Sequence, residues 1–161
     1  MRRAALLVFS LFVCAWAGAV LAAEKQLIVI ADEATYQGSA DWTELLRKSG
    51  VAVKHVLPSQ SAEYRKEKYI FLIGWPGEPG DAGRLVKEAL KPDEVRWVEE
   101  QGNRKYYIKP DLWSAGQTVL VFAGSDREAA LSAIRESKKA WWIQVASWFD
   151  LEVESKTLYG Y

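Results

Sequence analysis

Four short runs of mostly apolar residues predict the strands of this chain. They are Gln26–Ala31, Val51–Val56, Tyr69–Gly74 and Gln117–Gly124. Their length and their β-branched content are typical of strands, and the continuous apolar runs suit burial on both faces, as in a parallel sheet. We therefore expect Ile28, Val119 and Val121 to be buried in central strands.

Stretches with apolar residues three and four positions apart predict helices between these strands. One helix is expected to begin near Asp41, which can cap it together with Glu44, and to end at Gly50. Another is expected to begin at Asp81, which can also act as a cap, and to stop before Pro92.

A hairpin is predicted in the middle of the chain. The segments Val95–Glu100 and Arg104–Lys109 flank Gly102 and Asn103, a pair that is typical of turns. Arg96 and Lys105 should then lie on hairpin strands near an edge of the sheet.

The order of these elements predicts an α/β protein. We expect a single three-layer domain over residues 23–161, with a mostly parallel sheet and an antiparallel hairpin excursion. Its last element should be one aromatic-rich helix over about residues 126–149, opened by a capping box at Ser125–Glu128. Without a leader of 22 residues, 139 of the 161 residues remain, a usual size for one domain.

The first 22 residues have the pattern of a signal peptide. Arg2 and Arg3 precede the uncharged apolar run Ala4–Val20, and Ala22 is the kind of small residue that a signal peptidase reads. We expect an exported protein, whether periplasmic, surface-bound or secreted, whose mature chain begins near Ala23. Two alternatives stay open: retention of the run as a membrane anchor, and lipidation of Cys14.

Composition narrows the range of functions. Cys14 is the only cysteine, so the mature chain has no disulfide framework and no thiol nucleophile. Its 19 basic and 21 acidic residues nearly balance, which gives no reason to expect nucleic acid as a partner. We expect no cofactor and, after signal cleavage, no membrane span.

Candidate catalytic residues are few. His55 is the only histidine, which excludes a metal site of several imidazoles, and no Gly-x-Ser-x-Gly motif supplies a partner serine. The segment Gly74–Gly83 lies where a phosphate-binding loop would lie, but Pro76 and Pro79 remove amide donors. We interpret it as a structured turn, with a ligand-facing loop that contains Trp75 as the alternative.

Three carboxylates could share one rim of the sheet. Asp32 and Glu33 follow the first strand, and Asp126 follows the last. Such a rim could hold Mg²⁺ or an acid–base pair. Local roles at a loop and at a helix start explain the same residues more simply, so we expect no catalytic residues and no metal.

Aromatic residues crowd the end of the chain. The mature chain keeps seven of the eight tryptophans, and Trp141, Trp148 and Phe149 recur on one face of the predicted helix. We expect Trp141 and at least one of the other two to pack on the domain. Trp142, about 100° around the helix, should stay partly exposed for a partner. Trp142, Trp148 and Trp75 are therefore the candidate binding residues.

Three stretches carry a family resemblance: Ile70–Pro76, Lys105–Ile108 and Thr118–Ala130. Over about residues 69–134 the chain resembles the Rossmann-like extracytoplasmic domain of S-layer-type proteins. It is also similar to the non-catalytic accessory domain of hexosaminidase-type glycosidases. Gly77-Glu78-Pro79 replaces the Asn that often follows Gly-x-Pro in such domains, and Ala130 stands where Thr is more frequent. The resemblance implies a Rossmann-like fold with no catalytic residues to carry over.

The leading hypothesis is a non-catalytic exported module of the cell envelope that binds or assembles with a protein or a glycan. One alternative is a small periplasmic hydrolase or metal-dependent enzyme that uses the Asp32/Glu33/Asp126 rim. Another is a self-associating surface-layer or filament subunit.

Overall fold

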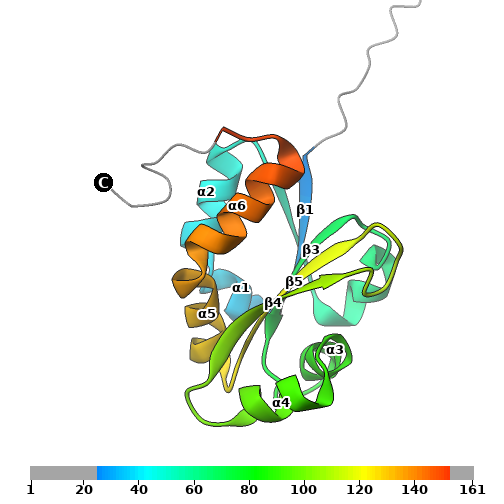
Figure 1. The fold of residues 1–161 in the computed structure, drawn as a ribbon, viewed down its shortest axis with the longest axis vertical. Helices are drawn as coiled ribbons and strands as arrows, with labels where there is room; N and C mark the ends of the chain where they lie inside the picture. The colour runs from blue at the N-terminus through cyan, green and yellow to red at the C-terminus, as the bar shows by residue number, and fades with distance from the viewer. Residues whose placement is uncertain (1–24, 153–161) are drawn as a thin grey trace, which may run out of the picture.

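A five-stranded sheet forms the middle of the computed structural model, which describes residues 25–152 (Figure 1). Its strand order is β2-β1-β3-β5-β4, with β1 (Gln26–Ile30), β2 (Ala52–Val56), β3 (Tyr69–Gly74), β4 (Arg104–Pro110) and β5 (Thr118–Gly124). All neighbouring strands are parallel except β4 and β5, which are antiparallel. The α/β class and the mostly parallel sheet are thus confirmed.

The central strands are apolar and buried. Ile28, Val119 and Val121 are at most 1% exposed, as predicted. Burial on both faces explains why these strands lack the polar alternation of a half-exposed sheet.

Helices cover both faces of the sheet. They are α1 (Glu33–Gln37), α2 (Ala40–Lys48), the 3-10 helix η1 (Pro58–Tyr64), α3 (Asp81–Ala89), α4 (Pro92–Glu99), α5 (Arg127–Glu136) and α6 (Lys138–Phe149). Residues of α2, α5 and α6 share one apolar cluster with one face of the sheet, and residues of α3 and α4 share a second cluster with the other face (Figure 1). The result is the expected three-layer arrangement.

The segment expected to form the first hairpin strand, residues 95–100, is helical instead. Pro92 occupies the start of α4, where its missing N–H is not needed, and Glu94 accepts a hydrogen bond from the Lys91 N–H at 2.7 Å. Val98 is buried against the sheet. Arg96 therefore lies on a helix, and the antiparallel partner of β4 is β5; Lys105 lies on the edge strand β4, as expected.

The long C-terminal helix is two helices. A break at Ser137, whose Oγ donates to the Ala133 carbonyl at 2.5 Å, separates α5 from α6. Asp126, rather than Ser125, caps α5 through the Ala129 N–H.

Two other helix starts also differ from expectation. Ser39 occupies the N-cap position of α2, which places Asp41 inside the first turn, and Gly80 precedes α3, whose first residue is Asp81. The short helix α1, capped by Asp32, was not predicted from the sequence.

The predicted signal peptide lies outside the described residues. Among residues 25–152, no helix has the length and apolar content needed to cross a membrane.

Candidate functional site

Two carboxyl groups meet at the carboxyl ends of β1 and β3. Asp32 follows β1 directly, and Glu78 lies in the turn between β3 and α3. The chain leaves β1 toward β2 on one side and returns after β2 to β3 on the other. In open α/β sheets, such a change of direction creates the crevice where ligands usually bind.

Asp32 is held as an anion. Its carboxylate caps α1, accepting from the Thr35 N–H at 3.0 Å and from the Thr35 hydroxyl at 2.7 Å, and Arg127 Nη2 lies 3.6 Å away. Burial opposes ionisation, but hydrogen bonds from Glu78 and Thr35 and the charge of Arg127 outweigh it. The pKa of Asp32 therefore lies well below its ordinary value of 3.8.

The environment of Glu78 shifts its pKa in the opposite direction. Its side chain is buried, with the residue only 8% exposed. Burial, the hydrogen bond with Asp32 and the negative charge of Asp32 raise the pKa of Glu78 to about 8, against the weaker effects of the Trp75 N–H and Arg127. At neutral pH the pair shares one proton, which resides on Glu78.

Two glycines make room for this arrangement. A Cβ on Gly74 would lie 2.7 Å from Glu78 Oε2, and a Cβ on Gly83 would lie 2.2 Å from the Glu78 carbonyl oxygen. The segment Gly74–Gly83 is therefore a tightly packed turn, in agreement with the structured-turn interpretation. Glu78 was not predicted as a site residue, although a glutamate among glycines and prolines after a buried strand was a usable signal.

The three carboxylates of the expected rim have different partners in the structure. Asp32 pairs with Glu78. Glu33 is exposed on α1, with Oε2 at 3.7 Å from His55 Nδ1, and Asp126 caps α5. No three His, Cys, Asp or Glu side chains within the described part of the chain are grouped as metal ligands.

His55 packs between the first two strands and α1. Its ring stacks on Tyr36 with the centroids 3.9 Å apart, and Nε2 lies 2.9 Å from the Ala31 carbonyl oxygen. The His55 ring is therefore held by a stacking contact with α1 and by a hydrogen bond at the end of β1.

The candidate binding tryptophans have three different environments. Trp75 is half-buried beneath the Arg127 guanidinium, which lies 5.5 Å from the ring centroid. Trp148 is half-buried and stacks on Tyr69 at 4.5 Å. Trp142 is 1% exposed, so the expectation that it stays partly exposed is wrong.

The burial of Trp142 follows from packing on two sides of α6. Trp142 contacts Trp141 edge-on at 6.0 Å and belongs to the same apolar cluster as Trp42 and Leu46 of α2. Trp141 contacts both Phe71 of the sheet and Trp42 of α2, Trp142 is buried in the same cluster, and Ile143 is the exposed apolar residue instead. Trp141 and Phe149 are buried, as expected.

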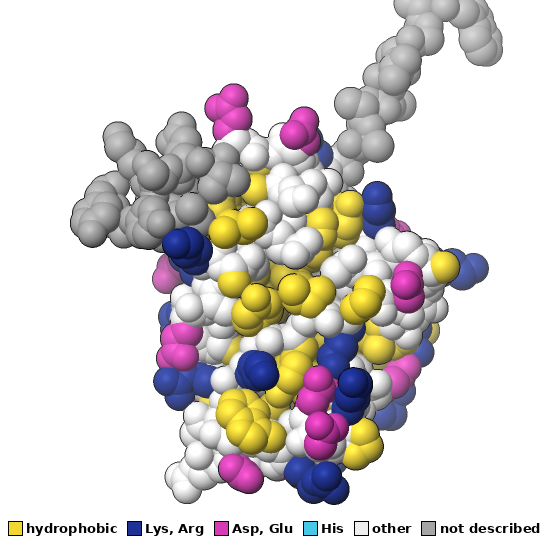
Figure 2. Space-filling model, viewed as in Figure 1, with side chains coloured by type: hydrophobic (Ala, Val, Ile, Leu, Met, Phe, Trp, Pro, Cys, Tyr) yellow, Lys and Arg dark blue, Asp and Glu magenta, His cyan; other side chains and the backbone are white. Residues whose placement is uncertain are grey.

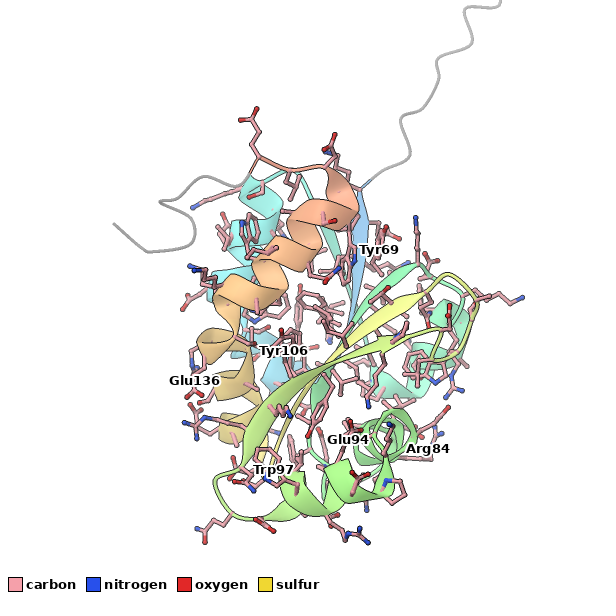
Figure 3. The ribbon with its side chains drawn as sticks, in the orientation of Figure 1. Tyr69, Arg84, Glu94, Trp97, Tyr106 and Glu136 are labelled. Atoms are coloured by element: carbon pink, nitrogen blue, oxygen red, sulfur yellow. The ribbon has the colours of Figure 1, made fainter. Side chains whose placement is uncertain are left out.

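A groove of about 550 Å³ lies between β4 and the helices α5 and α6. Its apolar lining residues are Tyr106, Ala133, Ala140 and Ile143, and its polar ones are Arg104, Lys105, Glu136, Ser137 and Lys139. Figure 2 shows hydrophobic side chains gathered over α6 and β4 with charged groups around them. In Figure 3, Tyr106 lies between β4 and the two helices, with Glu136 beside it on α5.

Comparisons of this chain with protein-family models, with curated proteins and with solved structures gave no significant match.

Proposed function

We propose that this protein is a non-catalytic, exported module of the cell envelope that binds a protein partner through the groove between β4 and α5–α6. The leader over residues 1–22 supports export, because it combines Arg2 and Arg3 with an uncharged apolar run. The resemblance to extracytoplasmic S-layer-type domains supports the same location and a binding role.

The carboxyl pair favours a structural role over catalysis. Both Asp32 oxygens are engaged, by the Thr35 N–H and by the Thr35 hydroxyl, and Arg127 balances the charge. The buried Glu78 carboxyl is bonded to Asp32 and to the Trp75 N–H. A general base must have an accessible lone pair toward its substrate. The ionised member of the pair, Asp32, is already bound by Thr35 and Arg127, and its lowered pKa makes it a weak base.

The groove carries the proposal, because it combines exposed apolar area with an open sheet edge. Ile143 on α6 is 49% exposed, and Ile108, on the same face of β4 as Tyr106, is 45% exposed. Within the described chain, β4 has β5 as its single neighbour in the sheet, so its outer edge can pair with further backbone. Apolar contact beside an open strand edge is typical of surfaces that bind extended protein segments.

The rim of the groove adds polar contacts. Arg104 forms an ion pair with Glu136 at 2.7 Å, and Lys139 lines the same groove. An apolar centre inside a polar rim is the usual anatomy of a protein interface.

Site-specific photo-crosslinking in the native host tests the proposal. A photoreactive residue at position 143 should form adducts with one partner protein, whereas the same residue at position 97 should not. Trp97 is a matched control, because it is 42% exposed but lies on α4, outside the groove. The purified partner should bind Ile143→Glu about tenfold or more weakly than wild type, and Trp97→Glu with little change.

Other results would change the kind of partner or contradict the proposal. Adducts between two copies of this chain would make it an assembly subunit. Binding to isolated wall glycan that Tyr106→Ala abolishes would make the partner a sugar. Equal adducts at positions 143 and 97, or an unchanged affinity for Ile143→Glu, would contradict a binding role for the groove.

A further inference from the structure

We propose that the proton shared by Glu78 and Asp32 is a latch. It holds the turn Trp75–Gly80 closed over the carboxyl ends of β1 and β3, and loss of the proton opens the turn.

The closed turn is held from beneath by the Glu78 side chain. Glu78 folds back under its own turn, where Oε2 accepts from the Trp75 N–H at 3.4 Å and the carboxyl group meets Asp32. Gly77, Pro79 and Gly80 are exposed on the outside. The turn therefore depends on this inner carboxyl group for its attachment to β1.

The backbone of the turn is tightly packed while the Glu78 carboxyl group stays in place. Gly83 of α3 approaches the Glu78 carbonyl so closely that a Cβ would lie 2.2 Å from its oxygen, and Gly74 leaves space for the Glu78 carboxyl only because it has no side chain. Asp32 is fixed by Thr35 and Arg127, so repulsion between two ionised carboxylates would displace Glu78 and the turn that carries it.

The charged groups around Glu78 disfavour a second negative charge. Asp32 comes from the end of β1, Glu33 from α1 and Asp81 from α3, and all three line the same hollow of about 240 Å³ as Glu78. Arg127 from α5 is the cation at the pair, and it already lies 3.6 Å from Asp32. Ionised Glu78 would thus be a buried charge among carboxylates, which is unfavourable unless water reaches it.

The pH at which the latch acts follows from this environment. Burial, the hydrogen bond with Asp32 and the charge of Asp32 raise the pKa of Glu78 to about 8. The turn should be closed at neutral and acidic pH and should open as the pH rises above about 8. An exported domain meets the pH of its surroundings directly, so the turn would open in response to alkaline conditions outside the cell. The latch does not depend on the proposed binding function.

Solution NMR of the mature chain tests the latch with two readouts. The Glu78 side-chain carboxyl carbon should titrate near pH 8 rather than near the ordinary 4.5. The protection of the Trp75 amide against hydrogen exchange, corrected for base catalysis, should fall about tenfold or more between about pH 6 and about pH 10. The Ala123 amide in the central strand β5 should keep its protection over the same range.

Three variants separate the latch from general alkaline loosening. Glu78→Gln keeps a donor toward Asp32 without an ionisable proton, so its Trp75 protection should not depend on pH. In Asp32→Asn, the carboxamide can donate to ionised Glu78, so the turn should stay closed at high pH. Glu33→Gln removes one surrounding charge without touching the pair, so its Trp75 protection should still fall with rising pH, at a pH close to that of wild type or slightly below it.

Several outcomes would overturn the latch. These are titration of Glu78 near its ordinary value, titration near pH 8 with unchanged or rising Trp75 protection, and opening of Asp32→Asn at the same pH as wild type. Loss of Trp75 protection in Glu78→Gln with the wild-type pH dependence would do the same. If Glu78→Gln fails to fold, the comparison of Asp32→Asn with Glu33→Gln still decides.

Discussion

Replacing each of two adjacent tryptophans by phenylalanine should separate the effect of a buried hydrogen bond from that of ring burial. Trp141 and Trp142 are 0% and 1% exposed and belong to the same apolar cluster. Trp141 Nε1 donates to the Ile134 carbonyl at 2.9 Å. Trp142 Nε1 is buried and has no acceptor among the described residues.

The expected magnitudes follow from this difference. Each Trp→Phe change loses the same atoms, which should lower the free energy of unfolding by about 1–2 kcal/mol through lost burial and a small cavity. Trp141→Phe also loses a hydrogen bond, a further cost of about 0.5–1.5 kcal/mol. Trp142→Phe removes an unpaired buried N–H, which should raise the free energy of unfolding by about 1–3 kcal/mol and so offset the lost burial. Trp141→Phe should therefore be the more destabilising change, by about 1.5–4.5 kcal/mol.

Urea unfolding of the mature chain measures both free energies, provided that the variants and wild type share one slope against denaturant. Trp142→Ala is the control for ring burial and should cost about 3–5 kcal/mol. If Trp142→Phe costs as much as Trp141→Phe, the unpaired indole N–H has no energetic consequence and the reasoning is refuted.

Four further outcomes are expected. Mass spectrometry of the protein from its native host should find an N-terminus within a residue or two of Ala23; an intact Met1 on a membrane-embedded chain would make the leader an anchor. Gly124→Ala should lower the free energy of unfolding by about 1–3 kcal/mol, because its Cβ would lie 2.3 Å from the Ala130 nitrogen and α5 would have to shift; a cost below about 0.5 kcal/mol would contradict that packing. Val121→Ala should cost about 1–3 kcal/mol in chemical unfolding because the residue is fully buried, and a neutral change would contradict its central position. Because the folded-state pKa of Glu78 is raised, its contribution to stability should be fully present below pH 4.5 and be lost as the pH rises to about 8; wild-type stability should fall relative to Glu78→Gln over that window, and parallel curves would refute the raised pKa.

The sequence was most informative about the buried strands. The runs that became β1, β3 and β5 are continuous and apolar, and their local pattern agrees with their burial on both faces. The interpretation of residues 95–100 went wrong because Val95 and Val98 suit either structure, and the hairpin signal at Gly102 belongs to the connection between α4 and β4. The decisive clue was Pro92. Proline can follow the end of a helix, but it also fits the first turn of one, and Pro92 occupies the first turn of α4.

The candidate site was harder to predict because it depends on tertiary contacts. Asp32 and Glu78 are 46 positions apart in the numbering, and only the pairing of β1 with β3 brings them together. The exposure of Trp142 was misjudged because Trp141 and Trp142, about 100° apart around α6, are both buried in one cluster, so the helix has no single narrow apolar stripe. Periodicity locates one buried face but does not reveal how many neighbours a helix has.

The direction of the central strands gives the molecule two unlike poles. Residue 25 lies beside the start of β1, and the end of α6 lies beside the start of β3, where Trp148 and Phe149 contact Tyr69. Both ends of the described chain are therefore at one pole, as Figure 1 shows, whereas Asp32 and Glu78 are at the other. A tether attached at residue 25 would leave the Glu78 turn pointing away from the surface that holds the protein, at a distance of about 17–20 Å set by the strand length.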